Sequence, residues 1–353
     1  MRREKLGNIK LGARLAKTIY NTDGGVLLSQ GIELKESFIQ KLVSQGITEI
    51  YIDDEISADI GVGDVVSETT RNDARVLISN LMNNYLFTQS IDVDQIKKTV
   101  YIIIDELLSQ KDILYSLSDI KSVDDYTFQH CVNVCILSLI TGIELGFDIE
   151  HLRELGTGAI LHDIGKLFIP KKILQKPSQL TVEEFEEIKK HTVLGYELLK
   201  KNEKISLASA FISFGHHERF DGSGYPLQLK GENIHIFPRI VAIADVYDAL
   251  TSDRVYRKKL KANEVFEYIT SLGIHHFDPK VIEAFVRHVS IYPVGTGVLL
   301  NTGERALVAK ANIKMPTRPL VRILGKDRSS SGKYYEIDLA EKTHIFIVDG
   351  CEI

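Results

Sequence analysis

The chain has 353 residues, of which 44% are hydrophobic and 26% charged, as is typical of a globular protein with about two or three domains. Its formal net charge of −5 provides no general attraction to nucleic acid or to an anionic membrane. Its three cysteines make no disulfide framework, and no apolar segment approaches the roughly 20 residues that cross a bilayer. The start lacks the apolar core of a signal peptide, so we expect a cytoplasmic protein without a membrane span.

Residues 1–65 alternate short apolar segments with turns and predict a small α+β domain. The expected elements are a β-hairpin, a helix and a last strand, in the order Leu15–Tyr20 and Val26–Leu28, Leu34–Gln45, and Ile47–Ile52. No histidine precedes His130, and nothing in this part has catalytic spacing. We interpret it as a regulatory or interaction domain.

Residues 66–292 predict an all-α domain that begins with linker helices, because apolar residues recur there at three- and four-residue spacing. The expected helices are Ala74–Phe87, Val93–Leu108, Val123–Leu145, Asp148–Leu161, 181–202, Ile205–Gly215, Pro238–Thr251, Ala262–Leu272 and Pro279–Val289. The helix from residue 181 opens with Thr181 and Glu184 at capping-box spacing.

The stretch His162–Lys166 places an imidazole next to a carboxylate at the end of an apolar helix. Neighbouring side chains on a regular helix point about 100° apart, so His162 and Asp163 can share one ion only where the backbone turns. We expect Gly165 to provide this turn in the left-handed conformation that closes many helices. Alone, the pair is also typical of a helix cap beside a structural histidine.

Other metal-ligating residues lie at the inner faces or ends of separate predicted helices, namely His130, His191, His216, His217 and Asp245. Leaving so many polar groups buried and unpaired would cost roughly 1–3 kcal/mol each, whereas a shared metal centre would satisfy them together. Five imidazoles and two carboxylates exceed the needs of one tetrahedral ion. We therefore expect two divalent ions that share a carboxylate, and mixed nitrogen and oxygen ligation suits iron, manganese or zinc.

Two longer motifs carry a family resemblance. HHERFDGSGYP runs from His216 to Pro226, and ADVYDALTSDRVYR runs from Ala244 to Arg257. Together with the His162–Lys166 stretch, they resemble the HD-GYP domain, a subgroup of the HD metal-dependent phosphohydrolases, over about residues 120–290. The resemblance implies a bacterial phosphodiesterase for cyclic dinucleotides, chiefly cyclic di-GMP.

The resemblance also implies two groups of metal ligands. The first group is His130, His162, Asp163 and Asp245. The second group is His191, His216 and His217, with Asp163 as the bridge. Some family members bind a third metal through a glutamate one helical turn before the position of His130, where this chain has Tyr126. Two metals and a linear dinucleotide product are therefore expected.

The expected phosphate-binding residues are Lys166, Arg254 and Arg257, since arginine offers a planar fork and lysine a point charge. Arg257 could equally be an ordinary surface cation. For catalysis we expect Asp163, Lys166 and Asp248. Asp248 follows Asp245 by about one turn, so it either supports the metal centre and handles protons or forms a helix salt bridge to Arg254.

The loop Gly222–Pro226 is expected beside the site, because its two glycines allow close backbone approach and Pro226 stiffens its exit. Tyr225 is a candidate for stacking on a guanine base. The segment Gly224-Tyr225-Pro226 could also contact a signalling protein, and an ordinary surface turn is the simpler alternative.

Residues 293–353 predict a small β-rich module, because the apolar period changes there from 3.6 to 2. Its expected strands are Val298–Leu300, Ala306–Val308, Leu320–Leu324, Tyr334–Leu339 and Ile345–Val348. The basic residues Lys310, Lys314, Arg318 and Arg322 are interpreted as a solvated face and not as a nucleic-acid site, because no aromatic residues are interleaved with them.

Three hypotheses follow. The first is hydrolysis of cyclic di-GMP to linear pGpG by a metal-bridging hydroxide, with further hydrolysis to GMP left open. The second is a module that senses a cyclic dinucleotide or docks partners without turnover. The third is an HD hydrolase of another cyclic dinucleotide or nucleotide. The metal, a homodimeric state and the signals received by the end domains are also left open.

Overall fold

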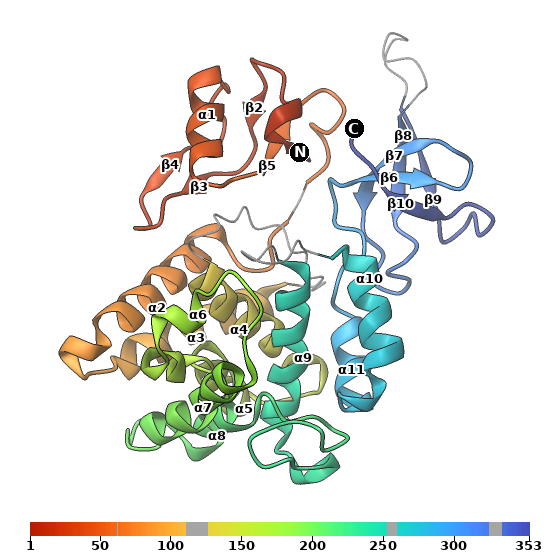
Figure 1. Ribbon diagram of the computed structural model, residues 1–353. Helices are drawn as coiled ribbons and strands as arrows, with labels where there is room; N and C mark the ends of the chain where they lie inside the picture. Colours follow the sequence, from red (N-terminus) through yellow and green to blue (C-terminus); the bar gives the residue numbers. More distant parts are fainter. Residues whose placement is uncertain (62, 111–125, 253–259, 325–333) are drawn as a thin grey trace. The chain divides into compact units, whose positions relative to one another are not determined.

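A computed structural model of the chain describes residues 1–61, 63–110, 126–252, 260–324 and 334–353 (Figure 1). The chain separates into two compact units, a helical unit of residues 66–113 and 126–288 and a second unit of residues 1–65, 114–125 and 289–353. The predicted fold class is confirmed, because a helical domain is accompanied by strands before and after it in the sequence. The division into three domains at residues 65 and 292 stays a prediction.

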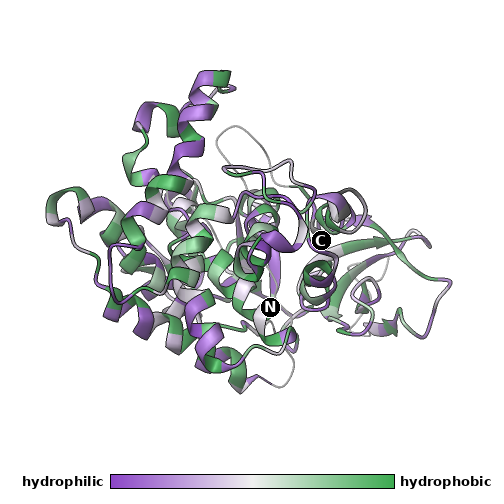
Figure 2. Ribbon diagram, turned by 90° about the horizontal axis from the view of Figure 1, so that it is seen from below, coloured by the Kyte–Doolittle hydropathy of each residue, from purple (hydrophilic) through white to green (hydrophobic). Residues whose placement is uncertain are grey.

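The helical unit contains both long helices and short helical turns. Its elements are α2 (Glu68–Thr88), α3 (Val93–Ser109), α4 (Tyr126–Glu144), α5 (Ile149–Ile160), η3 (Ile164–Phe168), α6 (Lys171–Leu174), α7 (Val182–Leu199), α8 (Leu207–Gly215), η4 (Gly231–Asn233), α9 (Ile236–Thr251), α10 (Ala262–Glu267), the π-helical turn η5 (Tyr268–Leu272), η6 (Gly273–His275) and α11 (Pro279–Val286). Single helices carry both hydrophobic and hydrophilic segments, as expected of amphipathic helices (Figure 2).

Helix α4 is the centre of this unit. It packs against α2, α5, α9 and α11, and residues 130–142 are buried throughout. Side chains at the helix starts accept hydrogen bonds from backbone N–H groups, as Asp148 does for α5 and Thr181 does for α7. The predicted capping box of Thr181 and Glu184 is present. Among the described residues, none of the helices is long and apolar enough to span a membrane.

The second unit begins with strands and one helix. Its elements before residue 65 are β1 (Arg2–Lys5), η1 (Leu6–Asn8), β2 (Arg14–Leu15), β3 (Ile19–Tyr20), β4 (Val26–Leu28), α1 (Glu36–Ser44) and β5 (Glu49–Asp53). The predicted hairpin is present as β3 and β4, but the single strand predicted over Leu15–Tyr20 is wrong. Leu15 pairs with Ile52 in the sheet β1-β5-β2, whereas Ile19 pairs with Leu28 in the hairpin, so the chain changes sheets between them.

Strand β1 was not predicted, because its sequence Arg-Arg-Glu-Lys has no apolar residue. The structure shows how such a strand can be buried: Arg2 pairs with Glu4 and, at 2.6 Å, with Asp54. Arg3 pairs with Glu49 of β5 at 2.5 Å. Burying charged groups is tolerated where each has an opposite charge as a hydrogen-bonding partner.

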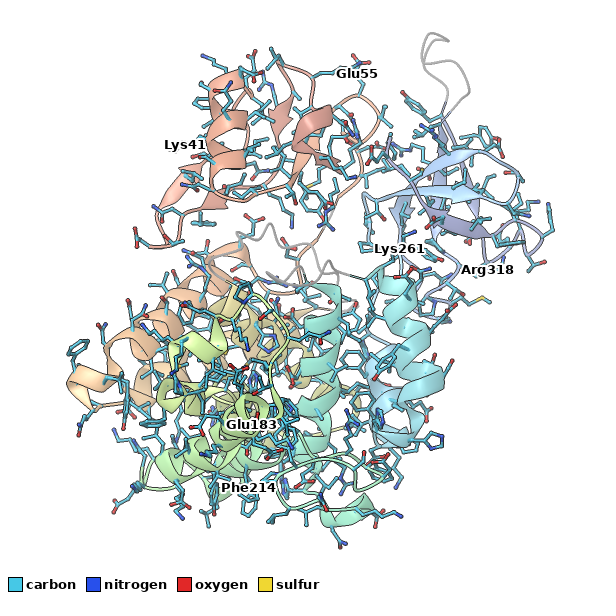
Figure 3. The ribbon with its side chains drawn as sticks, in the orientation of Figure 1. Lys41, Glu55, Glu183, Phe214, Lys261 and Arg318 are labelled. Atoms are coloured by element: carbon cyan, nitrogen blue, oxygen red, sulfur yellow. The ribbon has the colours of Figure 1, made fainter. Side chains whose placement is uncertain are left out.

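The residues after 289 form a five-stranded antiparallel sheet in the order β10-β6-β7-β8-β9. Its strands are β6 (Gly297–Leu300), β7 (Arg305–Lys310), β8 (Leu320–Leu324), β9 (Tyr335–Asp338) and β10 (Ile347–Gly350). Two of the basic residues are not a solvated face, so that interpretation was wrong for them. Arg318, labelled in Figure 3, donates to three backbone carbonyls, and Arg322 pairs with Asp59 at 2.6 Å and Glu336 at 2.7 Å. Lys310 and Lys314 are exposed.

Candidate metal centre

The adjacent ligands His162 and Asp163 leave the helix before they reach the site. Helix α5 ends at Ile160, a turn carries the pair, and η3 begins at Ile164. The predicted left-handed conformation of Gly165 is wrong, because it is not among the glycines with positive φ. A Cβ at position 165 would lie 1.9 Å from the carbonyl oxygen of His191. Glycine is therefore needed so that η3 can pack directly on the backbone of α7.

The structure brings all seven predicted metal ligands together from five parts of the helical unit. They are His130 of α4, His162 and Asp163 after α5, His191 of α7, His216 and His217 at the end of α8, and Asp245 of α9. Ligand atoms lie within 4.8 Å of one another in the groups His191–His216–His217, His130–His162–Asp245 and His162–Asp163–His216. Only His217 and Asp245 of this set are partly exposed.

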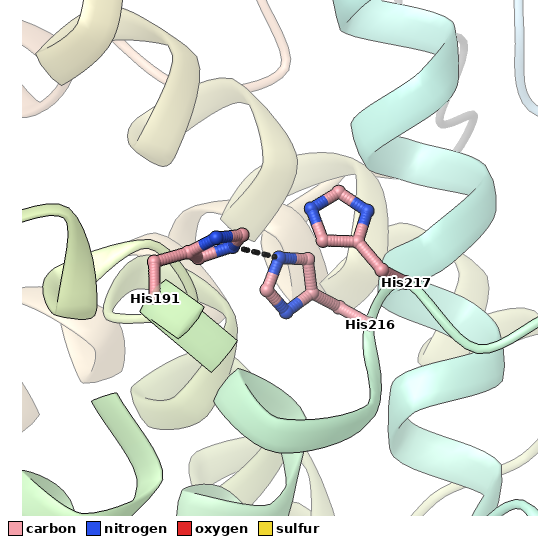
Figure 4. Close-up of side chains that lie close together, drawn as sticks. All are labelled: His191, His216 and His217. Atoms are coloured by element: carbon pink, nitrogen blue, oxygen red, sulfur yellow. Dashed lines mark hydrogen bonds between the residues drawn. The ribbon is translucent and has the colours of Figure 1, made fainter. Parts of the chain in front are cut away.

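Three of the histidines are held in one tautomer by backbone carbonyls. The Nδ1 atom of His162 lies 2.8 Å from the oxygen of Ala159, and those of His191 and His216 make similar contacts one turn back in their own helices. A carbonyl oxygen can only accept, so each Nδ1 carries the proton and each Nε2 presents a lone pair. The Nε2 atoms of His191 and His216 face each other at 3.3 Å (Figure 4). Two facing lone pairs suit a shared metal ion.

The two oxygens of Asp163 face different histidines. Oδ2 lies 3.3 Å from Nε2 of His162, whereas Oδ1 lies 3.5 Å from Nε2 of His191 and 3.9 Å from Nε2 of His216. Among the described buried side-chain atoms, His162 Nε2 and Asp163 Oδ1 have no hydrogen-bond partner. An unpaired buried polar group costs about 1–3 kcal/mol. These residues therefore fit a divalent metal centre in which Asp163 faces both histidine groups.

The histidines of the candidate metal centre differ in charge: His216 and His217 differ from His130. Burial, together with the neighbouring histidines, lowers the pKa of His217 to about 3 and that of His216 well below its usual value. Both imidazoles are therefore neutral at pH 7, as a metal ligand must be. Burial alone would also lower the pKa of His130, but Asp245 and Asp248 raise it to about 9. Without a metal, His130 is therefore protonated at pH 7.

Asp248 is fully buried and connects two other side chains. Its Oδ2 accepts from Nδ1 of His130 at 2.7 Å, and its Oδ1 accepts from Nδ2 of Asn133 at 2.7 Å. Nε2 of His130 faces Asp245 at 3.0 Å. This geometry favours the predicted support of the metal centre. The alternative salt bridge to Arg254 lies outside the described residues. Asn133 was missed, although it lies three residues after His130, on the same helix face.

Of the predicted phosphate-binding residues, only Lys166 can be placed, because Arg254 and Arg257 lie outside the described residues. Nζ of Lys166 donates to Oδ2 of Asp163 at 2.5 Å. Burial alone would lower the pKa of Lys166, but the carboxylate of Asp163 raises it, so the side chain is charged at neutral pH. It is thus a cation at the edge of the candidate centre.

The loop Gly222–Pro226 lies against this centre. Gly224 must be glycine, since a Cβ there would lie 2.3 Å from the backbone nitrogen of Arg219. The ring of Tyr225 stacks on His217, with centroids 4.8 Å apart and planes at 28°. The buried carboxylate of Glu218 accepts from the N–H groups of Leu227 at 2.7 Å and Leu229 at 3.0 Å, which fixes the loop exit. No role for Glu218 was predicted from the sequence.

Comparison with known families gives two matches. The HD domain matches residues 116–281, and a KOW domain associated with the HD domain matches residues 297–353. A solved structure of a protein from Bdellovibrio bacteriovorus, described as an HDG"Y"P protein, covers 80% of this chain and 97% of its own, with a TM-score of 0.51 and 16% identity. At that identity the likeness concerns the fold alone.

Curated relatives match between half and three quarters of this chain. A cyclic di-GMP phosphodiesterase of Pseudomonas aeruginosa is 36% identical over 256 residues, which are 72% of this chain and 62% of that protein. A cyclic di-GMP phosphodiesterase of Thermotoga maritima is 41% identical over 52% of this chain and 50% of that protein. A 3'3'-cGAMP-specific phosphodiesterase 2 of Vibrio cholerae is 28% identical over 70% of this chain and 48% of that protein. The chain thus spans about half to two thirds of the length of these relatives.

Proposed function

Because this chain belongs to the HD domain family, we propose that it is a metal-dependent phosphodiesterase that hydrolyses cyclic di-GMP to linear pGpG. The observation that carries the proposal is the placement of Asp163, whose two oxygens face separate groups of histidines. A carboxylate in this position can bridge two ions. A site built from imidazoles and buried carboxylates suits a hard phosphodiester only when metal cations are present to neutralise its charge.

We propose two divalent ions, with iron or manganese preferred and zinc as an alternative. The first ion would be held by His130, His162, Asp163 and Asp245, and the second by His191, His216, His217 and Asp163. When bound, such ions lower the pKa of a water molecule and neutralise charge that develops on the phosphate. The backbone carbonyls that fix the histidine tautomers would keep the ligands aligned before a metal arrives.

The remaining site residues have distinct proposed roles. Lys166 holds the Asp163 carboxylate in this structure, and its ammonium group is close enough to the centre to contact a phosphate oxygen of the substrate. Asp248 orients His130 and keeps its Nδ1 protonated. Arg254 and Arg257 are proposed as further phosphate contacts, and Tyr225 as a substrate contact. Asp163, Lys166 and Asp248 form the proposed catalytic group.

The experiment that tests the proposal uses the full chain, purified without chelators and reconstituted with ferrous iron or manganese. It is incubated with cyclic di-GMP, and the products are resolved by chromatography. Metal-dependent formation of pGpG is expected. GMP as the main product would contradict the two-metal expectation drawn from Tyr126. Binding without turnover under any metal would favour the alternative of a sensor or interaction module.

A second candidate substrate is 3'3'-cGAMP, because one relative of this chain is named for hydrolysing it. The same metal centre would act on either compound, since both contain two phosphodiester bonds between riboses. A panel of cyclic dinucleotides separates the two candidates. Other nucleotides cleaved by HD hydrolases belong in the same panel.

Three wider expectations accompany the proposal. A signalling protein could contact the segment Gly224-Tyr225-Pro226, although the ring of Tyr225 faces His217 and is thus only partly available to a partner. We also propose a cytoplasmic location and leave a homodimer open. Gel filtration and pull-down with the purified chain test the partner and the oligomeric state.

A further inference from the structure

An aromatic and cationic cluster lies beside the candidate metal centre. It consists of Phe185 and Lys189 on α7 and Tyr225 in the loop, and we refer to it as the α7 platform. The rings of Phe185 and Tyr225 meet edge to face, with centroids 6.3 Å apart. Nζ of Lys189 lies 4.9 Å from the centroid of Phe185 and 5.4 Å from that of Tyr225. Glu183, labelled in Figure 3, marks the first turn of α7, where the platform begins.

The side chains of the α7 platform extend from the candidate metal centre toward the surface. Tyr225 stacks on His217 and also contacts Phe185, so the ring contacts lead from a candidate ligand to Phe185. Phe185 is 44% exposed, which leaves part of its ring open to a ligand. From α7, Nζ of Lys189 reaches over the ring of Tyr225, which stacks on His217. A molecule whose phosphate reached the histidines would therefore pass close to the exposed ring of Phe185.

The cation in the platform is already held in place. Nζ of Lys189 donates to Oε1 of Glu186 at 2.6 Å while it lies over the two rings. A side chain with two such restraints loses less entropy on binding a ligand than a free surface lysine does. The ammonium group has three N–H donors, so it can donate to a ligand as well as to Glu186.

We propose that the α7 platform is the subsite for one guanine base of the substrate, with Phe185 as the stacking surface and Lys189 as the donor to O6 and N7 of the base. The inference rests on the proposed phosphodiesterase function and names the part of the substrate that this face recognises. In a cyclic dinucleotide each ribose carries both a base and the bridging phosphate, so a base must lie close to the reacting bond. Bases stack on aromatic rings, and lysine is a common donor to guanine O6 and N7.

The two contacts have different consequences for specificity. Stacking on Phe185 holds guanine and adenine alike, because every base has an aromatic face. Lys189 discriminates, because adenine carries an amino donor where guanine carries O6, and two donors cannot pair. Lys189 should thus favour cyclic di-GMP over a substrate with adenine in this subsite, whereas Phe185 should not.

The test measures kcat/KM of the metal-reconstituted full chain for cyclic di-GMP, cyclic di-AMP and bis(p-nitrophenyl) phosphate, which is a phosphodiester without a base. Cyclic di-AMP must place an adenine in the subsite, whereas 3'3'-cGAMP could still place its guanine there. Relative to bis(p-nitrophenyl) phosphate, Phe185→Leu should lower kcat/KM for both cyclic dinucleotides roughly tenfold. Lys189→Met should reduce the preference for cyclic di-GMP over cyclic di-AMP roughly tenfold. The matched controls are Lys190→Met, at the exposed neighbouring lysine, and Phe211→Leu, at a ring of α8 that is 40% exposed. Both controls should stay within about twofold of the parent chain.

Equal losses on all three substrates would overturn the inference, because they would mean that Phe185 and Lys189 only brace Tyr225 and His217. Unchanged ratios in both variants would overturn it too. If the parent chain hydrolyses none of the three substrates, the proposed function fails. The same variants are then compared by calorimetry for binding of cyclic di-GMP and cyclic di-AMP, where a ratio unaffected by Lys189→Met would refute the guanine subsite.

Discussion

The buried carboxylate of Asp248 gives the sharpest prediction about the metal centre. Each of its oxygens accepts from a different donor, Nδ1 of His130 and Nδ2 of Asn133, both at 2.7 Å. Asp248→Asn replaces one oxygen by an NH2 group. When a metal binds Nε2 of His130, Nδ1 keeps its proton, so the NH2 group of the new amide faces another donor, either this imidazole N–H or the NH2 group of Asn133. A buried donor left without an acceptor costs about 1–3 kcal/mol.

This cost should weaken metal binding, because His130 avoids the facing donor by turning away from its place beside Asp245. Loss of a supporting hydrogen bond to a metal-bound histidine typically lowers affinity about 10–100-fold. We therefore expect Asp248→Asn to weaken binding of one manganese ion by roughly that factor. The other ion, at His191, His216 and His217, should be nearly unaffected. Isothermal titration calorimetry with manganese, together with metal content after gel filtration, measures both.

A double variant provides the control. Combining Asp248→Asn with Asn133→Asp moves the carboxylate to position 133, where it accepts from the new amide and still accepts from Gln129, which donates to Asn133 at 3.1 Å in the parent chain. The oxygen of the new amide then accepts from His130. Partial recovery of manganese affinity is expected in the double variant. The reasoning is refuted if Asp248→Asn binds two ions normally, or if the double variant binds no better than either single variant.

Three further predictions concern packing, the loop and pH. Gly165→Ala should destabilise the helical unit by about 3 kcal/mol, because its Cβ would lie 1.9 Å from the backbone oxygen of His191. The control Gly7→Ala, whose Cβ would have nothing within 4 Å, should have little effect. Thermal unfolding measures both variants. Glu218→Gln should speed amide hydrogen exchange at Leu227 or Leu229, since one of the two N–H groups loses its acceptor. Unchanged exchange at both positions would contradict the loop assignment. Because the pKa of His130 is about 9, a metal that binds this histidine below pH 9 must displace a proton, so manganese affinity at the His130 group should rise about tenfold per pH unit from pH 6 to 8. The pKa of His217 is about 3, so manganese affinity at the His217 group should show no such slope. Equal slopes for the two groups in calorimetry would contradict this.

The seven candidate ligands could be predicted because the sequence places each at the end or inner face of a strongly periodic helix. Their convergence depends on packing, which the pattern does not show. The role of Gly165 illustrates the limit: a glycine after a helix predicts a left-handed turn, but the structure needs it because η3 meets the backbone of His191. Close approach between elements distant in sequence cannot be read from local preferences.

Residues that are not candidate metal ligands were harder to predict. Asn133 acts through a hydrogen bond to Asp248, far along the chain, and Glu218 acts through hydrogen bonds to two backbone N–H groups of a loop, so neither has a local pattern. Strand β1 escaped prediction because ion pairs, and not apolar side chains, allow Arg2 to be buried. Arg318 was misinterpreted for a related reason, since its guanidinium group donates to the backbone carbonyls of Leu339, Thr343 and Ile345.

The central claim is that Asp163 joins two metal ions that together hydrolyse cyclic di-GMP. The most direct measurement compares the parent chain with Asp163→Ala for manganese stoichiometry by calorimetry and for pGpG formation by chromatography. The account predicts two ions and metal-dependent pGpG for the parent chain, and fewer than two ions with no turnover for the variant. Full turnover by Asp163→Ala, or a parent chain that binds two ions without cleaving cyclic di-GMP, would contradict it.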